Sequence, residues 1–474
     1  MKEPATLDKV LDGKDKAVAD DSRQNVAHSE LSRRGVLGFA AAGAAGLGLG
    51  MLARPAEAHS ERVRAAGNPI IPGRGICDPQ IRVWNDEVWL YATHDADPAA
   101  KGFIMRDWHI WRSCDLVNWR EAGTLKPEQT YWRKPSDQCW ATDAARKDGR
   151  YYLYFSRGPK EIGVVVADHP AGPWRDPIGK PLIAEGLVKT EARDPGILQD
   201  ADGTNYIVFG TFRYFIARLG KDMVSLAEAP RPLKIEKAIG PYAKGLTDDK
   251  PFLHRRGDLY YLSWGSYYAI GRNPYGPFET QGSVLSEATT DPELRLMRPG
   301  VRYDPLNYDR HGSFFELNGQ WYFACNDQAT PGATEFYRNS VISYVHYRAD
   351  GTIAPVRLST IGVGQYDLHR GITAADFFDT RGGAVVHLGG DVFALELSPG
   401  GLARYPNVRG LSPALTILAN GPLEIRSGSP RGHLLARGTG RLAIASRRAT
   451  EDLYLVNNSA ATVRVDELRL EAAS

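Results

Sequence analysis

Short runs of hydrophobic, mostly aromatic residues recur along the middle of the chain, separated by longer polar stretches. Five runs share this character and begin roughly 55 to 60 residues apart, at positions 89–93, 151–156, 206–210, 260–265 and 321–325. Runs of this composition and length are typical of β-strands. A period of this size is typical of propeller blades or solenoid units.

Turn-forming residues precede most of these runs. Gly, Asn or Asp stand at positions 85–86, 147–149, 200–203, 256–258 and 318–319. Such turns between strands indicate hairpins. No long amphipathic helical pattern interrupts the series, so we predict an all-β fold in which residues 66–364 form a five-bladed β-propeller with four strands in each blade.

The repeat ends near residue 364, and the remaining residues have a different pattern. Short alternating segments occur at 384–388, 423–426 and 463–470. They predict a second all-β domain over residues 366–474, a β-sandwich. No Trp occurs in this part of the chain. Because sugar platforms are usually aromatic, packing against the propeller is as strong an expectation for this domain as sugar binding.

The first 58 residues resemble a twin-arginine export signal. Arg33-Arg34 is followed by a weakly hydrophobic Ala/Gly/Leu run to Leu52 and by the small-x-small sequence Ala56-Glu57-Ala58. Because this run contains many glycines, a permanent membrane span is the less favoured interpretation. We therefore expect a periplasmic or extracellular protein that begins near His59.

The amino-acid composition limits the classes of partner that the chain is expected to bind. The 58 Lys and Arg nearly balance the 56 Asp and Glu, which gives no electrostatic reason to expect nucleic acid or an anionic membrane. Aromatic residues make up 10% of the chain and suit stacking on sugar rings as well as core packing. The four cysteines show no C-x-x-C spacing, so neither a zinc ribbon nor a redox motif is indicated.

Acidic residues stand where three of the predicted blades begin. They occur in Asp78-Pro79, Asp194-Pro195 and Asp248-Asp249-Lys250-Pro251. The innermost strands of a propeller start near one end of its channel, so these carboxyl groups should converge although they are far apart in sequence. Cleavage of a glycosidic bond usually needs two carboxyl groups, one protonated and one ionised.

The blade-start motifs resemble glycoside hydrolase family 43. The resemblance implies that Asp78 is the general base and that Asp194 orients and tunes the acid. The family acid is usually a Glu in Glu-Gly-Pro, whereas the aligned stretch here reads Asp249-Lys250-Pro251. Asp249 is therefore the expected acid and Asp248 the alternative. Strand alternation predicts that Lys250 points away from Asp249, outside the site.

Further positions follow from the same resemblance. Residues 139–143 resemble the Trp-Ala-Pro-Asp phrase of the family, which implies a sugar contact for Trp140, and Arg338 falls where related enzymes bind substrate. His311 matches a histidine near a central cation, which implies a structural calcium ion, while the chemistry itself needs no cofactor. Read alone, Trp140 and His311 would be core residues and Arg338 a surface ion pair, and these alternatives stay open.

The sequence thus predicts an inverting, exo-acting hydrolase of terminal arabinofuranose or galactofuranose residues, with β-xylosides as the second substrate class. Two alternatives remain. The missing Glu is compatible with a carbohydrate-binding propeller that has lost catalysis. A retaining fructan-active enzyme would use the same architecture with Asp78 as nucleophile. The start of the second domain, at 372–379, and its last strand also resemble carbohydrate-binding modules of family 6.

Overall fold

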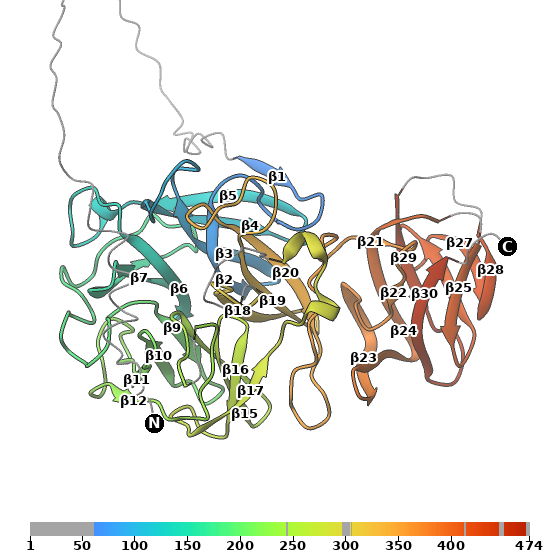
Figure 1. Cartoon of the computed structure of the whole chain (residues 1–474). Coiled ribbons are helices and arrows are strands. Elements are labelled where there is room, and N and C mark those ends of the chain that lie inside the picture. Colours follow the sequence, from blue (N-terminus) through green and yellow to red (C-terminus); the bar gives the residue numbers. More distant parts are fainter. Residues whose placement is uncertain are drawn as a thin grey trace, which may run out of the picture. The chain divides into compact units, whose positions relative to one another are not determined.

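The computed structural model describes residues 61–242, 245–295, 304, 306–411, 414–444 and 450–470. The predicted export signal, residues 1–58, lies outside this part. Within it, no helix is long and apolar enough to cross a membrane. The described residues are nearly all in strands and turns, which confirms the predicted all-β class (Figure 1).

Five separate sheets follow one another from residue 62 to residue 345 and form the five blades. Their strands are β1 (Arg62–Arg64), β2 (Ile76–Trp84), β3 (Glu87–Asp95), β4 (Met105–Ser113), β5 (Asn118–Leu125); β6 (Cys139–Lys147), β7 (Arg150–Arg157), β8 (Glu161–Ala167); β9 (Gly196–Gln199), β10 (Asn205–Phe209), β11 (Phe215–Arg218), β12 (Arg231–Pro232); β13 (Ile235–Glu236), β14 (Pro251–Arg256), β15 (Leu259–Trp264), β16 (Tyr267–Gly271), β17 (Phe278–Ser283); β18 (Gly312–Leu317), β19 (Gln320–Asp327), β20 (Asn339–Val345). Three short 3-10 helices accompany them, η1 (Pro127–Gln129), η2 (Glu287–Thr289) and η3 (Pro292–Leu294).

The expectation of four strands in every blade is wrong. The blades have five, three, four, five and three strands in chain order. In the first blade β1 adds to the outer edge by pairing with β5, and in the fourth blade β13 pairs with β17 in parallel. In the second and fifth blades the outer edge carries only single bridges, Val166 to Arg175 and Tyr347 to Ile353 among them. The outer edge is where the repeat varies.

The innermost strands form a closed ring. They are β2, β6, β9, β14 and β18, and each contacts the next, with β18 returning to β2. A separate buried hydrophobic cluster fills each space between neighbouring blades. Between the first two blades, for example, the rings of Trp108 and Phe155 lie 4.8 Å apart. Packing therefore fixes the angle of each blade, and with it the start of each inner strand.

The segment between β1 and β2 closes the ring. Ile70 donates its backbone N–H to the Ser340 carbonyl of β20. The Asn68 side chain donates to the carbonyls of Ile342 and Ser359 at 2.9 and 2.8 Å, and it accepts from the Ile342 N–H at 2.9 Å. The fifth blade is thus held to the first by the connection between two strands of the first blade.

The C-terminal residues form one hydrogen-bonded network of ten strands around their own core. The long strand β24 pairs with β21, β23, β29 and β30. The strands are β21 (Tyr366–Asp367), β22 (Ile372–Thr373), β23 (Asp379–Gly389), β24 (Val392–Arg409), β25 (Ala414–Ala419), β26 (Leu423–Ser427), β27 (His433–Gly438), β28 (Gly440–Ala443), β29 (Thr450–Val456) and β30 (Val463–Leu470).

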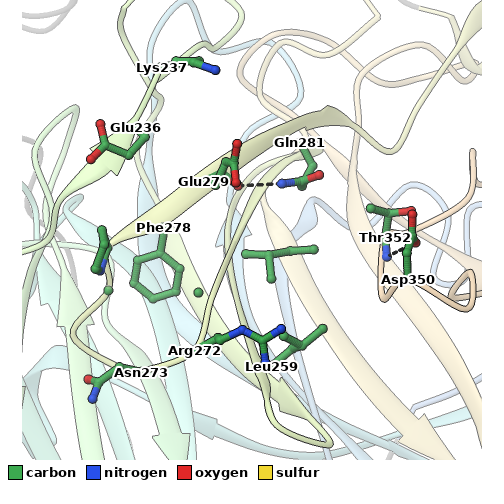
Figure 2. A pocket seen from close by; sticks show the side chains of 14 residues that line it. Glu236, Lys237, Leu259, Arg272, Asn273, Phe278, Glu279, Gln281, Asp350 and Thr352 are labelled. Carbon is green, nitrogen blue, oxygen red and sulfur yellow. Dashed lines mark hydrogen bonds between the residues drawn. The ribbon is translucent and has the colours of Figure 1, made fainter.

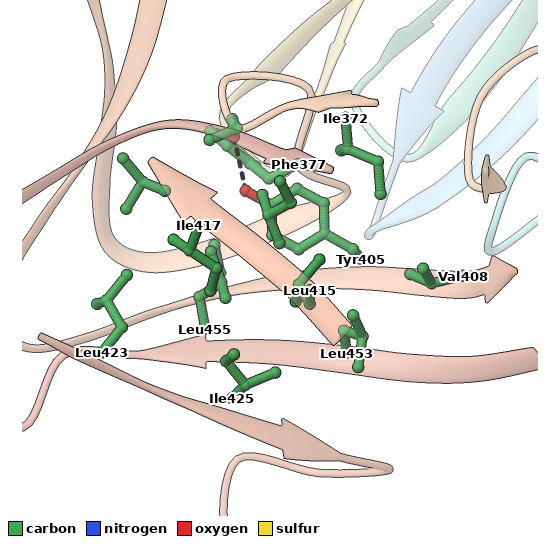
Figure 3. Close-up of a cluster of buried hydrophobic side chains, with 14 of the residues drawn as sticks. Ile372, Phe377, Tyr405, Val408, Leu415, Ile417, Leu423, Ile425, Leu453 and Leu455 are labelled. Atoms are coloured by element: carbon green, nitrogen blue, oxygen red, sulfur yellow. Dashed lines mark hydrogen bonds between the residues drawn. The ribbon is translucent and has the colours of Figure 1, made fainter. Parts of the chain in front are cut away.

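The aromatic residues of the C-terminal domain are mostly internal. Phe377 and Tyr405 lie in its hydrophobic cluster, where the Tyr405 hydroxyl donates to the Ala374 carbonyl (Figure 3). Phe393 is also buried. Phe378 packs instead into the cluster between the first and fifth blades. These four rings are therefore used in packing and offer no platform for a sugar.

Polar contacts join this domain to the fifth blade. The hydroxyls of Tyr344 and Tyr366 lie 2.7 Å apart, and Gln320 donates to the Ala375 carbonyl at 2.8 Å. Gln320 is buried and has little access to water. Its bond to Ala375 therefore gives its amide group a partner that water cannot supply.

Candidate active site

Three blades begin with the same backbone device. Asp78, Asp194 and Lys250 each precede a proline at or near the start of an inner strand, and each has a positive φ, of 47°, 59° and 56° respectively. Residues other than glycine rarely adopt this conformation, and where it occurs it often marks a functional site. All three side chains are buried.

Asp78 lies in a strongly positive environment. Arg338 Nη1 and Asn326 Nδ2 donate to its Oδ1 at 3.0 and 2.8 Å, and the Asp78 N–H donates to Asn326. Burial alone would raise the pKa of Asp78, but the charge of Arg338 and the contact with His311 outweigh it and hold the pKa well below its usual range. Asp78 is therefore ionised at neutral pH, as a general base must be.

His311 lies between the carboxylates. Its Nε2 is 2.5 Å from Asp249 Oδ1 and 3.5 Å from Asp248 Oδ2. Its Nδ1 is 3.1 Å from Asp309 Oδ1 and 3.7 Å from Asp78 Oδ1. Burial would lower the pKa of His311, but the surrounding carboxylates, Asp249 first, raise it well above the ordinary value. The imidazole therefore carries a proton next to Asp249.

Asp249 and Asp248 have different surroundings. Arg193 Nη2 lies 3.2 Å from Asp249 Oδ2, opposite the contact with His311. The carboxylate of Asp248 accepts the Asp249 N–H at 2.8 Å, and its carbonyl accepts the Tyr214 hydroxyl at 2.8 Å. Asp248 thus shapes the local backbone, while Asp249 contacts both Arg193 and His311.

Asp194 is close to the same group. Arg193 Nε lies 3.8 Å from its Oδ2, which also accepts the Lys250 N–H at 3.1 Å. Burial raises the pKa of Asp194 to about 6, with Asp249 adding to the rise and Arg193 and Lys250 opposing it. Asp194 therefore titrates just below neutral pH.

The expectation that Lys250 points away from the site is wrong. Its side chain is 1% exposed, and Nζ donates to the Thr142 carbonyl of the second blade at 2.8 Å. Burial lowers the pKa of Lys250, whereas the charges of Asp143, Asp194 and Asp78 oppose that shift. Strand alternation fails because Lys250 has a positive φ and lies before the strand begins. The ammonium group is thus an internal cation of the centre.

Arg338 and Trp140 reach the centre from different blades. Arg338 is 3% exposed, so it is not a surface residue, and it pairs with Asp78 and with Asp95 at 3.0 Å each. Trp140 is half-buried, and the Arg193 guanidinium lies 5.1 Å from the centroid of its ring. The structure thus brings together Asp78, Asp194, Asp249, His311, Arg338 and, through Arg193, Trp140.

Arg193 and Asp95 are charged residues of the centre that the sequence did not single out. Arg193 lies 2.7 Å from Glu191 and also pairs with Asp249. It directly precedes Asp194, and this position next to a predicted site residue could have indicated its role. Asp95 gave no signal, because it pairs with Arg338 at a separation of 243 residues. Only the closed ring brings those two side chains together.

A pocket of about 840 Å³ lies on the fourth blade, away from these residues. Its lining includes Glu236, Lys237, Arg272 and Glu279, and Asp350 and Thr352 approach from a loop after the fifth blade (Figure 2). It contains none of the carboxylates at the blade starts.

The comparison with protein families agrees with this geometry. The family model described as glycosyl hydrolases family 43 matches residues 66–353, well over half of the chain. The chain belongs to glycoside hydrolase family 43. It is accordingly a glycoside hydrolase with a carbohydrate substrate, and the predicted resemblance is confirmed.

Relatives of this family 43 enzyme differ in the substrates that their names give. A xylosidase/arabinosidase of Bacteroides ovatus is 27% identical over 60% of the chain and 96% of its own length. A β-D-galactofuranosidase of Aspergillus niger is 27% identical over 63% of the chain and 87% of its length. An arabinoxylan arabinofuranohydrolase of Paenibacillus polymyxa is 26% identical over 64% of the chain and 53% of its length.

Solved structures show the same fold. A family 43 arabinoxylan arabinofuranohydrolase from Bacillus subtilis has a TM-score of 0.52 at 20% identity and covers 86% of this chain and 97% of its own. A β-xylosidase/α-arabinofuranosidase from a compost metagenome, in a calcium-free form, has a TM-score of 0.50 at 26% identity and covers 62% of this chain and 98% of its own.

Proposed function

We propose that this family 43 enzyme is an exo-acting, inverting hydrolase that removes terminal arabinofuranose or galactofuranose residues. The observation that carries the proposal is the set of three buried aspartates, Asp78, Asp194 and Asp249, gathered with Arg193 and His311 at the blade starts. Two carboxyl groups with different protonation are the requirement of this chemistry.

In the proposed mechanism Asp78 takes a proton from water while that water attacks the anomeric carbon. Arg338 and Asn326 keep the Asp78 carboxylate ionised and oriented. Asp78 and Asp249 lie near different nitrogens of the His311 ring. A gap between the two carboxyl groups that admits water is what inversion requires.

Asp249 donates a proton to the leaving oxygen in this proposal. Its neighbour Arg193 favours the ionised carboxylate, which opposes the role of an acid. The protonated His311, whose Nε2 lies 2.5 Å from Asp249 Oδ1, supplies a proton to that oxygen, whereas Arg193 contacts Oδ2. We therefore propose that the acid is the hydrogen-bonded pair of Asp249 and His311, with Asp194 orienting it.

The names of the relatives support furanosides first. A galactofuranosidase and an arabinofuranohydrolase are among them, and β-xylosidase activity is the alternative because a xylosidase/arabinosidase is equally similar. Membership of family 43 favours neither a purely carbohydrate-binding propeller nor a retaining fructan-active enzyme.

We also propose a structural calcium ion near His311. Groups of His311 with Asp78 and Asp309, and with Asp248 and Asp249, place their ligand atoms within 4.8 Å of one another. Carboxylate oxygens suit Ca²⁺, so the donors fit. Asp309 and Asp248 are the members of these groups to which the proposed reaction assigns no role. A bound ion would supply positive charge beside the carboxylates.

Export through a twin-arginine signal to the periplasm or beyond is likewise proposed. Its support is the Arg33-Arg34 motif, the weakly hydrophobic run and the Ala56-Glu57-Ala58 sequence.

A screen of 4-nitrophenyl furanosides and pyranosides tests the substrate proposal. We expect the highest kcat/KM on α-L-arabinofuranoside or β-D-galactofuranoside, and proton NMR of the first product should show inverted anomeric configuration. Higher kcat/KM on β-D-xylopyranoside would select the alternative substrate. A product of retained configuration would refute the mechanism.

A further inference from the structure

A second group of histidine and carboxylate side chains lies on the first blade, outside the catalytic centre. His94 lies near the end of β3, Asp107 and His109 on β4, and Glu121 on β5. The three strands are neighbours in one sheet, and His109 pairs with Ala92 on one side and with Thr124 on the other. Alternate residues share a face, so His94 and Asp107 meet beside His109.

The ligand atoms of this group converge. Asp107 Oδ1 lies 2.6 Å from His94 Nδ1 and 3.4 Å from His109 Nε2. One ligand atom from each of the three residues lies within 4.8 Å of the others. The side chains of His94, Asp107 and His109 are 24%, 20% and 18% exposed. An ion from solvent can therefore reach them, while most of their surface is fixed by packing.

A fourth side chain orients His109. Its Nδ1 is 3.0 Å from Glu121 Oε1, and the Thr124 hydroxyl also donates to that oxygen at 3.3 Å. A histidine that binds a metal usually donates its other ring N–H to a carboxylate, which fixes the tautomer and the ring. Glu121 lies at that position beside Nδ1 of His109. The other ring nitrogen, Nε2, therefore faces Asp107. An ordinary surface ion pair does not require this second carboxylate.

From this geometry we infer a zinc site formed by His94 Nδ1, His109 Nε2 and the carboxylate of Asp107, with Glu121 as the orienting partner of His109. Two imidazoles and a carboxylate are a ligand set that Zn²⁺ favours. Bonds of about 2.0–2.2 Å in a tetrahedron separate the ligand atoms by roughly 3.3–3.5 Å. The 3.4 Å contact of His109 already has this length, and the contact of His94 needs to open by under about 1 Å.

The site would tie three strands together next to the catalytic centre. Asp95 follows His94 directly, and its carboxylate accepts two hydrogen bonds from the Arg338 side chain, at 3.0 and 3.1 Å. Arg338 in turn contacts Asp78 at 3.0 Å. Zinc at His94 therefore stabilises the end of β3 from which Asp95 holds Arg338, and it takes no part in bond cleavage.

The test uses the full enzyme freed of metal by dialysis against a chelator. Zn²⁺ is titrated calorimetrically, and Co²⁺ is titrated to record the visible absorption of a tetrahedral site. The wild type should bind one equivalent of zinc. The double variant His94→Gln/His109→Gln should lose this equivalent, which means that its affinity for zinc is at least 100-fold weaker. Exposed His433 on β27 gives the control His433→Gln, which should bind as the wild type does.

Two further measurements separate the zinc site from a network of ion pairs. Glu121→Gln should keep the stoichiometry and weaken zinc about 10- to 100-fold, as loss of an orienting partner does. Zinc should raise the thermal midpoint of the wild type and leave that of the double variant unchanged. Asp107→Asn, with a folded circular dichroism spectrum, is a second variant that should lose the equivalent. If both variants bind zinc like the wild type, as they would if His311 held it, the inference is wrong.

Discussion

The charges around Asp249 make the identity of the acid the sharpest question at the level of single residues. Asp249→Asn should lower kcat about 10²- to 10⁴-fold on natural glycosides, the usual size of an acid–base contribution. Substrates with very acidic phenol leaving groups should lose far less, because they need little help from a proton. Steady-state kinetics on a leaving-group series measures the difference.

Asp78→Asn is the matched control for this experiment, because loss of water activation should abolish turnover of both substrate types. Asp248→Asn tests the alternative acid. If Asp248→Asn or Glu191→Gln removes natural-substrate turnover while Asp249→Asn stays within a few-fold of wild type, Asp249 is not the acid.

The pKa of Asp194 predicts an acidic limb in the pH profile of kcat. Its orienting role needs the ionised carboxylate, so kcat should fall as the pH drops below the pKa of about 6. Lys250 lowers the pKa of Asp194 by its charge, so Lys250→Met should move the limb to higher pH. The exposed Lys221→Met should leave it in place. An unchanged limb in folded Lys250→Met would contradict the electrostatic role of Lys250.

For single residues, the sequence predicted where the carboxylates of the centre lie better than it predicted which groups surround them. Proline after Asp78 and Asp194 marked the blade starts, and the structure brings both carboxylates to one centre. Lys250 could not be placed, because alternation holds only inside a regular strand, and Lys250 precedes β14 and has a positive φ. The pairing of Arg338 with Asp95 depends on ring closure, which no local pattern encodes.

Among the elements, the inner strands were predictable and the outer ones were not. Inner and middle strands are hydrophobic and repeat, whereas the edge strands β1 and β12 are short and polar, Arg62–Arg64 and Arg231–Pro232. Such edges depend on pairing with a neighbour that the sequence pattern does not reveal. The sequence therefore predicted five blades correctly and the strands in each blade incorrectly.

The segment that closes the ring gives a prediction on stability. Asn68→Ala removes two hydrogen bonds to carbonyls and one from the Ile342 N–H. We expect a loss of about 2–4 kcal/mol in the free energy of unfolding, because each buried group left without a partner costs about 1–3 kcal/mol. Urea denaturation followed by tryptophan fluorescence measures it.

Asn273 makes one local bond at the surface, to the Tyr275 N–H, so Asn273→Ala is the comparison and should cost under about 1 kcal/mol. Equal effects of the two substitutions would show that Asn68 does not hold the blades together.

For the whole molecule, the C-terminal domain should support the propeller more than it binds sugar. Deleting residues 366–474 would uncover the place where Phe378 packs between the first and fifth blades and leave Gln320 without its bond to Ala375. The shortened protein should show a lower thermal midpoint or lower solubility, while KM of the folded fraction changes little. Clear affinity of the isolated domain for a polysaccharide would contradict this.

The closing contact also determines when the catalytic centre comes into existence. Asn68 and Ile342 are 274 residues apart, and Asp78 meets Asn326 and Arg338 across the same seam. Contacts of such long range cannot form until most of the chain is available. Until the fifth blade has been synthesised, Asp78 therefore lacks the side chains of Asn326 and Arg338. Closure of the ring by the last blade completes both the propeller and the surroundings of Asp78, so we expect a chain truncated before that blade to be inactive.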